Sequence, residues 1–141
     1  MFSALLFFLL LFTPLIFLHE LGHYIAALMC GVRVEAFSVG FGRVIWKTQR
    51  WGTEWRLSAI PFGGYVKMAG ENHSDDRIPE PDELWAKSPW QRAFIAFAGP
   101  AVNLLLPVLV FTWFLMSGHH IVAPIIGGVN AGSAAAKAGI Q

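Results

Sequence analysis

Two long runs without a charged side chain constrain this sequence more than any other feature. Residues 1–18 carry no charge, the apolar character resumes after a short polar break and continues to residue 30, and residues 93–116 again carry no charge. A helix of roughly 20 residues spans a hydrocarbon core about 30 Å thick, so each run is long enough to cross a membrane. Charged residues make up only 13% of the chain, against about 25% in a soluble domain. We therefore predict a multi-pass α-helical membrane protein with transmembrane helices in residues 1–30 and 92–117.

The basic residues predict how these helices are oriented. Nine of the ten Lys and Arg lie between the two runs. Cytoplasmic loops are enriched in Lys and Arg, so we expect residues 31–92 to be cytoplasmic and both ends of the chain to lie outside. A cleaved signal peptide is the alternative for the first run, but it would begin with positive charge, and residues 1–3 have none. The nine residues are Arg33, Arg43, Lys47, Arg50, Arg56, Lys67, Arg77, Lys87 and Arg92.

The residues between and after the runs divide into three parts. In residues 31–70, aromatic and β-branched side chains recur around turn material at residues 50–53, which indicates a β-hairpin. Its hydrophobicity favours a hairpin that re-enters the membrane, and a small surface hairpin is the alternative. Residues 71–91 are acidic and proline-rich, as in a solvated loop, with a short helix expected near residues 83–87. Residues 118–141, rich in Gly and Ala, resemble the start of a soluble domain.

The polar break in the first run, His19-Glu20-Leu21-Gly22-His23, is an HExxH motif. On a helix, residues i and i+4 share a face, so the imidazoles of His19 and His23 can bind one zinc ion. Glu20 follows the first ligand directly and can approach a water at the metal without occupying a coordination position. This arrangement predicts Glu20 as the general base, which takes a proton from the water and delivers it to the leaving amine.

The position of this motif inside an apolar run distinguishes it from a chance match. A charge near the centre of a membrane helix costs roughly 2.5–3.5 kcal/mol, so ionisable residues there mark functional sites by default. Cys30 is the only cysteine, which excludes an internal disulfide and a cysteine-based zinc site. The net charge of +1 without a basic run argues against a nucleic-acid partner, whereas the apolar runs predict contact with membrane lipid. A soluble-type metallopeptidase and a non-enzymatic membrane adaptor with an inert motif are the alternatives to a membrane metalloprotease.

Further motifs follow HExxH in order along the chain, namely Gly40-Phe41-Gly42, Pro61-Phe62-Gly63-Gly64-Tyr65-Val66-Lys67-Met68, Ala98-Gly99-Pro100-Ala101-Val102-Asn103 and Gly132-Ser133-Ala134-Ala135-Ala136-Lys137-Ala138-Gly139-Ile140. With HExxH they resemble the site-2 protease family of intramembrane zinc metalloproteases, and more closely its bacterial regulator-of-sigma-E protease branch. The resemblance implies that the first two of these motifs form a membrane-reentrant β-hairpin. It also implies that the third is a GPxxN motif on the second span and that the last begins a PDZ-like domain.

The resemblance also implies a function, namely regulated intramembrane proteolysis by a metalloendopeptidase of the bacterial inner membrane. The substrates would be single-span membrane proteins, such as anti-sigma factors or remnants of signal peptides. The hairpin would bind the substrate as an added strand, which makes Gly40 and Gly42 candidate substrate-binding residues. Asn103 is a third candidate, because an amide there could hold the substrate backbone or stabilise the oxyanion; alternatively, it bonds a neighbouring helix.

One part of the family's zinc site is missing from these 141 residues. The family takes its third ligand from the aspartate of a Leu-Asp-Gly motif on a later span, and this sequence contains no Leu-Asp-Gly. His73, His119 and His120 are conceivable substitutes, with a loop or interface role as the alternative for each. We therefore expect the chain to be a fragment of a longer protein and to be inactive by itself.

Overall fold

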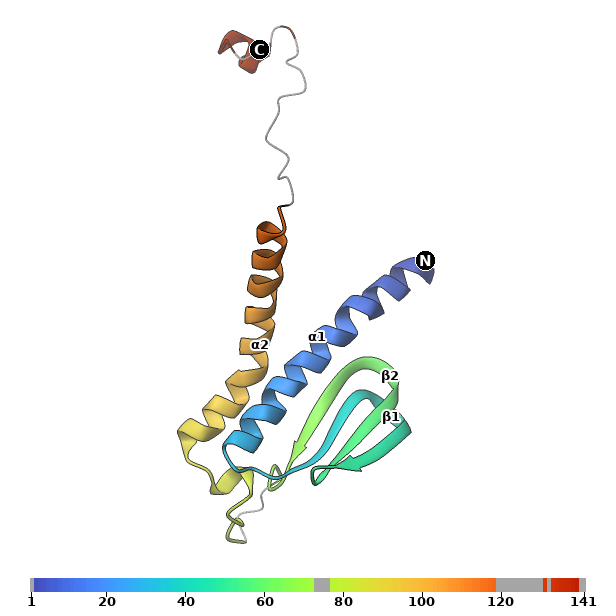
Figure 1. Cartoon of the computed structure of the whole chain (residues 1–141), viewed down its shortest axis with the longest axis vertical. Helices are drawn as coiled ribbons and strands as arrows, with labels where there is room; N and C mark the ends of the chain where they lie inside the picture. The colour runs from blue at the N-terminus through green and yellow to red at the C-terminus, as the bar shows by residue number, and fades with distance from the viewer. Residues whose placement is uncertain (1, 73–76, 119–130, 132, 140–141) are drawn as a thin grey trace. The chain divides into compact units, whose positions relative to one another are not determined.

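The computed structural model describes residues 2–72, 77–118, 131 and 133–139. The chain divides into two compact units, Met1–Val108 and Leu109–Gln141. The first unit contains the HExxH motif and the hairpin, and the second contains the end of the second long helix and a short helix. In chain order the elements are α1 (Phe2–Met29), β1 (Val34–Arg50), β2 (Thr53–Met68), the 3₁₀ helix η1 (Leu84–Ala86), α2 (Pro89–Met116) and α3 (Ala134–Lys137) (Figure 1).

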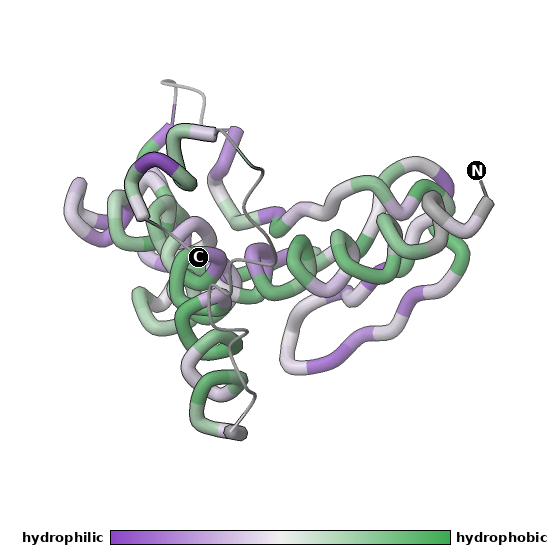
Figure 2. The backbone as a smooth tube through the Cα atoms, turned by 90° about the horizontal axis from the view of Figure 1, so that it is seen from above, coloured by the Kyte–Doolittle hydropathy of each residue, from purple (hydrophilic) through white to green (hydrophobic). Residues whose placement is uncertain are grey.

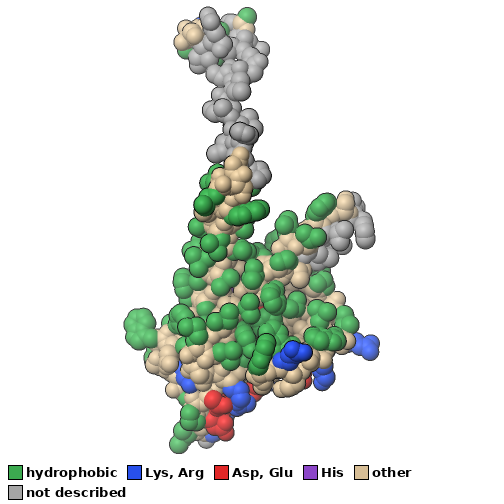
Figure 3. All heavy atoms as spheres, viewed as in Figure 1, with side chains coloured by type: hydrophobic (Ala, Val, Ile, Leu, Met, Phe, Trp, Pro, Cys, Tyr) green, Lys and Arg blue, Asp and Glu red, His purple; other side chains and the backbone are tan. Residues whose placement is uncertain are grey.

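Two helices of the described chain are long and apolar enough to cross a membrane, namely α2 over its whole length and Leu10–Met29 of α1. Many of their large apolar side chains are exposed, whereas the core helix of a soluble protein would bury them. Figure 2 shows the apolar character of both helices, and in Figure 3 the charged side chains gather around the hairpin and the polar loop. The prediction of two helices apolar enough to span a membrane is confirmed.

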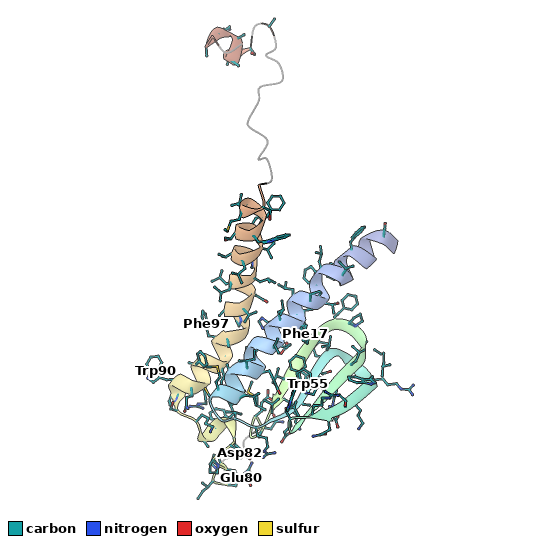
Figure 4. The ribbon with its side chains drawn as sticks, in the orientation of Figure 1. Phe17, Trp55, Glu80, Asp82, Trp90 and Phe97 are labelled. Carbon is teal, nitrogen blue, oxygen red and sulfur yellow. The ribbon has the colours of Figure 1, made fainter. Side chains whose placement is uncertain are left out.

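α2 begins at Pro89, earlier than the predicted boundary at residue 92. The reason is a capping box, in which Ser88 N–H donates to Oε1 of Gln91 at 3.1 Å and Gln91 N–H donates to Oγ of Ser88 at 3.3 Å. Proline is favoured at the first helical position, where its missing N–H leaves no hydrogen bond unmade. Trp90 points away from the helix at this end (Figure 4) and is 82% exposed, as expected of an aromatic residue at a membrane interface.

β1 and β2 form an antiparallel hairpin whose turn lies at Trp51 and Gly52. Both turn residues have positive φ, 52° and 77°, as a two-residue turn of type I′ requires. The turn lies within the predicted residues 50–53, and the strands extend over most of the predicted strand region. The hairpin is therefore as predicted from the sequence, although whether it enters a membrane stays a prediction.

Each strand of the hairpin is bent, so that its two halves lie beside different neighbours. Residues 34–39 pair with residues 64–68 on one side and with residues 54–57 on the other. In the second pairing the residue numbers of both segments increase in the same direction. Gly40 and Gly63, at φ +87° and +120°, allow the bends that take both strands out of the first ladder. The halves therefore lie side by side in the order 64–68, 34–39, 54–57 and 44–50.

The core of the first unit lies where the second half of α1 packs on the sheet. Phe37 of β1 is 1% exposed and meets Phe17 and Tyr24 of α1 edge-on, with ring centroids 5.6 and 5.7 Å away. Trp55 of β2 packs on the same ring at 4.7 Å, and Figure 4 shows Phe17 and Trp55 in the space between α1 and the hairpin. Aromatic pairs of this kind add stability beyond the burial of their area. The cluster thereby fixes the HExxH turn of α1 relative to the hairpin.

The described part of the polar loop is hydrogen-bonded to the segment that follows α1. Arg33 N–H donates to the carbonyl oxygen of Asp82 at 2.9 Å, and Arg33 Nε donates to its carboxylate at 2.7 Å. The hydrogen bond from the Arg33 guanidinium lowers the pKa of Asp82 below its ordinary value of 3.8. Ala69 N–H donates to the Arg33 carbonyl at 2.8 Å, which adds a third hydrogen bond to this segment. Further along the loop, η1 at Leu84–Ala86 is shorter than the helix predicted at residues 83–87.

In the second unit, α3 begins after Ser133, whose Oγ accepts a hydrogen bond from Ala136 N–H at 3.2 Å. Most of the predicted start of a PDZ-like domain, residues 118–141, lies outside the described residues, as do His73, His119 and His120. These predictions therefore stay predictions.

Candidate metal centre

His19 and His23 lie one turn apart on the same face of α1, as their spacing predicts. Their Nε2 atoms are 3.3 Å apart, and the rings meet edge to face with centroids 4.9 Å apart. Both side chains are half-buried. Two ring nitrogens therefore converge on one point beside the helix.

α2 supplies a partner for the outer ring nitrogen of each histidine. Nδ1 of His23 donates to the carbonyl oxygen of Ile95 at 2.7 Å, and Nδ1 of His19 lies 3.0 Å from Nδ2 of Asn103. The bond to Ile95 requires the His23 proton to be on Nδ1, which leaves the lone pair of Nε2 for a metal. Each imidazole is thus held between its own helix and α2.

Glycines allow α1 and α2 to approach closely enough for these contacts. A Cβ on Gly22 would lie 2.7 Å from the Ala98 carbonyl oxygen and 2.9 Å from Cγ2 of Val102. A Cβ on Gly99 would overlap Nε2 of His23 and lie 2.7 Å from its Cδ2. Real Cβ atoms essentially never approach within 3.0 Å, so both positions require glycine in this packing. Gly99 in particular leaves free the space that the His23 ring occupies.

Glu20 lies between two cavities and lines both of them. The loop-side cavity, of about 510 Å³, is bounded by α1, the polar loop and the start of α2. The residues lining it include Glu20, His23, Glu71, Trp85, Arg92 and Ile95. The hairpin-side cavity, of about 300 Å³, is bounded by α1, the hairpin and α2. The residues lining it include His19, Glu20, Phe41, Gly63, Gly64 and Asn103. The predicted base can therefore be reached from two directions.

The hairpin backbone passes directly beside Glu20. A Cβ on Gly64 would lie 3.0 Å from Cγ of Glu20 and 2.7 Å from the carbonyl oxygen of Ser38 on the neighbouring strand half. Gly64 also lies at the end of the 64–68 half, which is an outer row of the sheet. This close approach brings strand backbone next to the predicted catalytic side chain.

The predicted substrate-binding glycines shape the hairpin around this cavity. Gly40 and Gly42 have φ of +87° and +81°, and a Cβ on Gly40 would lie 2.7 Å from the Ile60 carbonyl oxygen. Phe41 between them lines the hairpin-side cavity, whereas neither glycine is among its lining residues. Asn103 does line it. Contact of these three residues with a substrate stays a prediction.

The two histidines fit two corners of a tetrahedral zinc site. Zinc–nitrogen bonds of about 2.0–2.1 Å in tetrahedral geometry place two ligand nitrogens about 3.3–3.4 Å apart. The separation of the two Nε2 atoms is 3.3 Å. Within residues 2–72, 77–118, 131 and 133–139, no third His, Cys, Asp or Glu completes a group of three. Catalytic zinc sites use three protein ligands, so this part of the chain offers two of them, with Glu20 beside them.

The sequence did not indicate the roles of Gly22 or of the Ile95 carbonyl. A glycine inside a helix costs roughly 1 kcal/mol relative to alanine, which is a signal that Gly22 serves close packing. Gly64, by contrast, is a glycine within a strand, which indicates a bend or a close approach of backbone, and it makes such an approach beside Glu20. Ile95 contributes only a main-chain oxygen, for which its side chain gives no sequence signal.

These features define a class, an HExxH-type metal centre on an apolar helix that packs against a second apolar helix and a hairpin. Residues 7–139 match the model of the family described as peptidase family M50, and the chain belongs to that family. The predicted resemblance to the site-2 protease family is thereby confirmed. Together, the family and the two membrane-length apolar helices identify a membrane protein.

Curated relatives are similar over most of this chain. A protein of Helicobacter pylori (strain J99), named provisionally as a zinc metalloprotease, is 45% identical over 120 residues, covering 82% of this chain and 34% of the relative. A protein of Brucella suis biovar 1 with the same kind of name is 42% identical over 147 residues, covering 95% and 39%. Metalloprotease MmpA of Caulobacter vibrioides is 41% identical over 146 residues, covering 87% and 36%. The chain thus spans between 34% and 39% of the length of these three relatives.

Proposed function

We propose that the protein carrying this chain is a zinc-dependent intramembrane metalloendopeptidase. It hydrolyses a peptide bond inside the transmembrane segment of a single-span membrane protein, as a step of regulated intramembrane proteolysis. The observation that carries this proposal is the convergence of His19 and His23 within an apolar helix, at the 3.3 Å nitrogen separation that two zinc ligands require. The relatives named as zinc metalloproteases support the choice of metal.

The chemistry divides between the metal and the side chains of this chain. When bound, zinc supplies a Lewis acid that polarises the scissile carbonyl and makes water more acidic. His19 and His23 hold the ion from one side, and Glu20 takes the proton of the attacking water and passes it to the leaving amine. Since Glu20 lines both cavities, water can reach it from the loop side while the substrate occupies the hairpin side.

The substrate has to be extended before it is cut, because a helix hides its peptide bonds in its own hydrogen bonds. The outer row of the hairpin at residues 64–68 ends beside Glu20 and can pair with an extended chain. In this proposal Gly40 and Gly42 set the path of the hairpin around the substrate, and Asn103 borders the same cavity. Anti-sigma factors and remnants of signal peptides are substrates of the required single-span type.

The site of action in this proposal is the bacterial inner membrane, with residues 31–92 in the cytoplasm and both ends of the chain outside. Cysteines placed singly at Glu80 and Ser133, after Cys30 has been replaced, distinguish the two orientations. An impermeant thiol reagent added to intact cells should label the cysteine at Ser133 and spare the one at Glu80. Labelling of Glu80→Cys alone would reverse the proposed topology.

The catalytic assignment is tested in the whole protein with Glu20→Gln and His19→Ala. Glu20→Gln should retain zinc and lose cleavage of a reporter transmembrane segment, because Glu20 is a base and not a ligand. His19→Ala should lose zinc as well, and Glu80→Gln, an exposed carboxylate elsewhere in the chain, is the matched control. Cleavage by Glu20→Gln at the normal rate would refute the assignment. A wild-type protein that retains zinc but cleaves no membrane segment would favour the membrane adaptor.

A further inference from the structure

One of the two polar atoms of the Asn103 side-chain amide lacks a hydrogen-bond partner. Its Nδ2 lies 3.0 Å from Nδ1 of His19, whereas its Oδ1 is buried and has no hydrogen-bond partner. A buried acceptor without a donor costs about 1–3 kcal/mol, so native structures rarely retain one without a reason. A half-turn of the amide exchanges the two atoms and places the oxygen against the His19 ring.

Metal binding decides which of the two atoms should face His19. If Nδ2–H donates to Nδ1, the remaining ring proton of a neutral His19 is on Nε2, the atom that faces His23 across 3.3 Å. That proton blocks the nitrogen that would bind the metal. If Oδ1 faces the ring instead, it accepts from Nδ1–H, and the lone pair of Nε2 becomes available.

We propose that Asn103 is a positioning residue for the metal: its side-chain oxygen accepts the proton of His19 Nδ1 and so keeps Nε2 of His19 free to bind the ion. Asn103 then does for His19 what the Ile95 carbonyl does for His23. α2 supplies one acceptor oxygen to each imidazole, and the two histidines present their Nε2 atoms together. The inference rests on the proposed zinc site, and it gives Asn103 a role distinct from contact with the substrate.

The test compares zinc affinity in the whole protein, measured by competition with a chromophoric chelator, for wild type, Asn103→Ala and Asn103→Asp. Loss of the acceptor in Asn103→Ala should weaken zinc binding about 10–100-fold, as removal of such partners does at other zinc sites. Asn103→Asp keeps an acceptor oxygen and should restore most of the affinity. With cobalt in place of zinc, the visible absorption band should change in Asn103→Ala and return in Asn103→Asp, because it reports the geometry of the ligands.

Leu104→Ala is the matched control, since this neighbour on α2 is 69% exposed. Thermal melts of each variant show whether the protein is folded. If folded Asn103→Ala binds zinc as tightly as wild type while cleavage falls, Asn103 acts on the substrate and the proposal is wrong. If Asn103→Asp binds zinc as weakly as Asn103→Ala, the acceptor is not what matters, and the proposal is also wrong. A wild-type protein that binds zinc but cleaves nothing would refute the proposed function and leave this comparison intact.

Discussion

A methyl group on Gly99 would occupy the space in which the His23 ring lies, and Gly99→Ala therefore tests how the metal centre is built. The added Cβ would overlap Nε2 of His23 and lie 2.7 and 2.8 Å from the ring carbons Cδ2 and Cε1. Ordinary contact begins at 3.4 Å, so the whole ring has to move away from α2. The ring cannot move freely, because its Nδ1 is held 2.7 Å from the Ile95 carbonyl oxygen on the same helix.

The size of the effect follows from these distances. Moving the ring carbons from 2.7 and 2.8 Å to 3.4 Å, and Nε2 by more than that, displaces the imidazole by about 1 Å. A misplacement of about 1 Å can reduce a catalysed rate about 10²-fold. Loss of the hydrogen bond that orients a zinc ligand typically weakens metal affinity about 10–100-fold. We expect both effects in Gly99→Ala.

The assay measures zinc affinity by chelator competition and cleavage of a reporter transmembrane segment at saturating zinc. Ala93→Ser is the matched control, because it also adds one heavy atom to α2 but on an exposed position. Alanine has a better helix propensity than glycine by roughly 0.8–1.0 kcal/mol, so Gly99→Ala is not expected to lose helix stability through propensity. Wild-type zinc affinity and cleavage in Gly99→Ala would refute this close packing of Gly99 against the His23 ring.

Three further outcomes are expected. Gly64→Ala should reduce cleavage at least about tenfold, equal to about 1.4 kcal/mol of barrier, without loss of zinc, because its Cβ would lie 3.0 Å from Cγ of Glu20. A chelator should abolish cleavage, and added zinc should restore it; activity that survives complete zinc removal would contradict the metal mechanism. The Arg33 hydrogen bond lowers the pKa of Asp82, so its stabilising contribution is complete above the ordinary value of 3.8 and is lost as the pH falls below it. Hydrogen exchange of the Arg33 amide should accelerate over that acid range, and exchange unaffected by pH beyond its intrinsic dependence would refute this role.

The sequence predicted the elements of the fold that depend on composition and local pattern. The two apolar runs predicted α1 and α2, and the turn material at residues 50–53 predicted the turn of the hairpin. The pairing of the four strand halves with one another was not predicted, since it is long-range and alternation along a strand does not reveal it. The earlier start of α2 has a local signal, the capping box of Ser88 and Gln91, which composition alone does not capture.

The candidate site was predictable only where side chains have a chemical signature. The spacing of His19 and His23 predicted their shared face, and the structure brings their Nε2 atoms together. Asn103 was identified as a candidate, but its position against His19 depends on how α1 and α2 pack. The same packing brings the Ile95 carbonyl to His23, and a main-chain oxygen has no counterpart in a sequence pattern. The roles of these residues in binding a metal or a substrate stay predictions until the variants are measured.

The two histidines differ in how sensitive their hydrogen-bond partners on α2 are to amino-acid substitution. The oxygen that holds His23 belongs to the main chain at Ile95, so any residue that keeps the helix at that position still provides it. The support for His19 is the side chain of Asn103, which almost every substitution removes. A substitution at position 95 that keeps the helix therefore keeps the acceptor of His23, whereas a substitution at position 103 keeps an acceptor for His19 only if the new side chain carries an oxygen. The orientation of one histidine therefore depends on backbone geometry, and that of the other depends on the identity of one side chain.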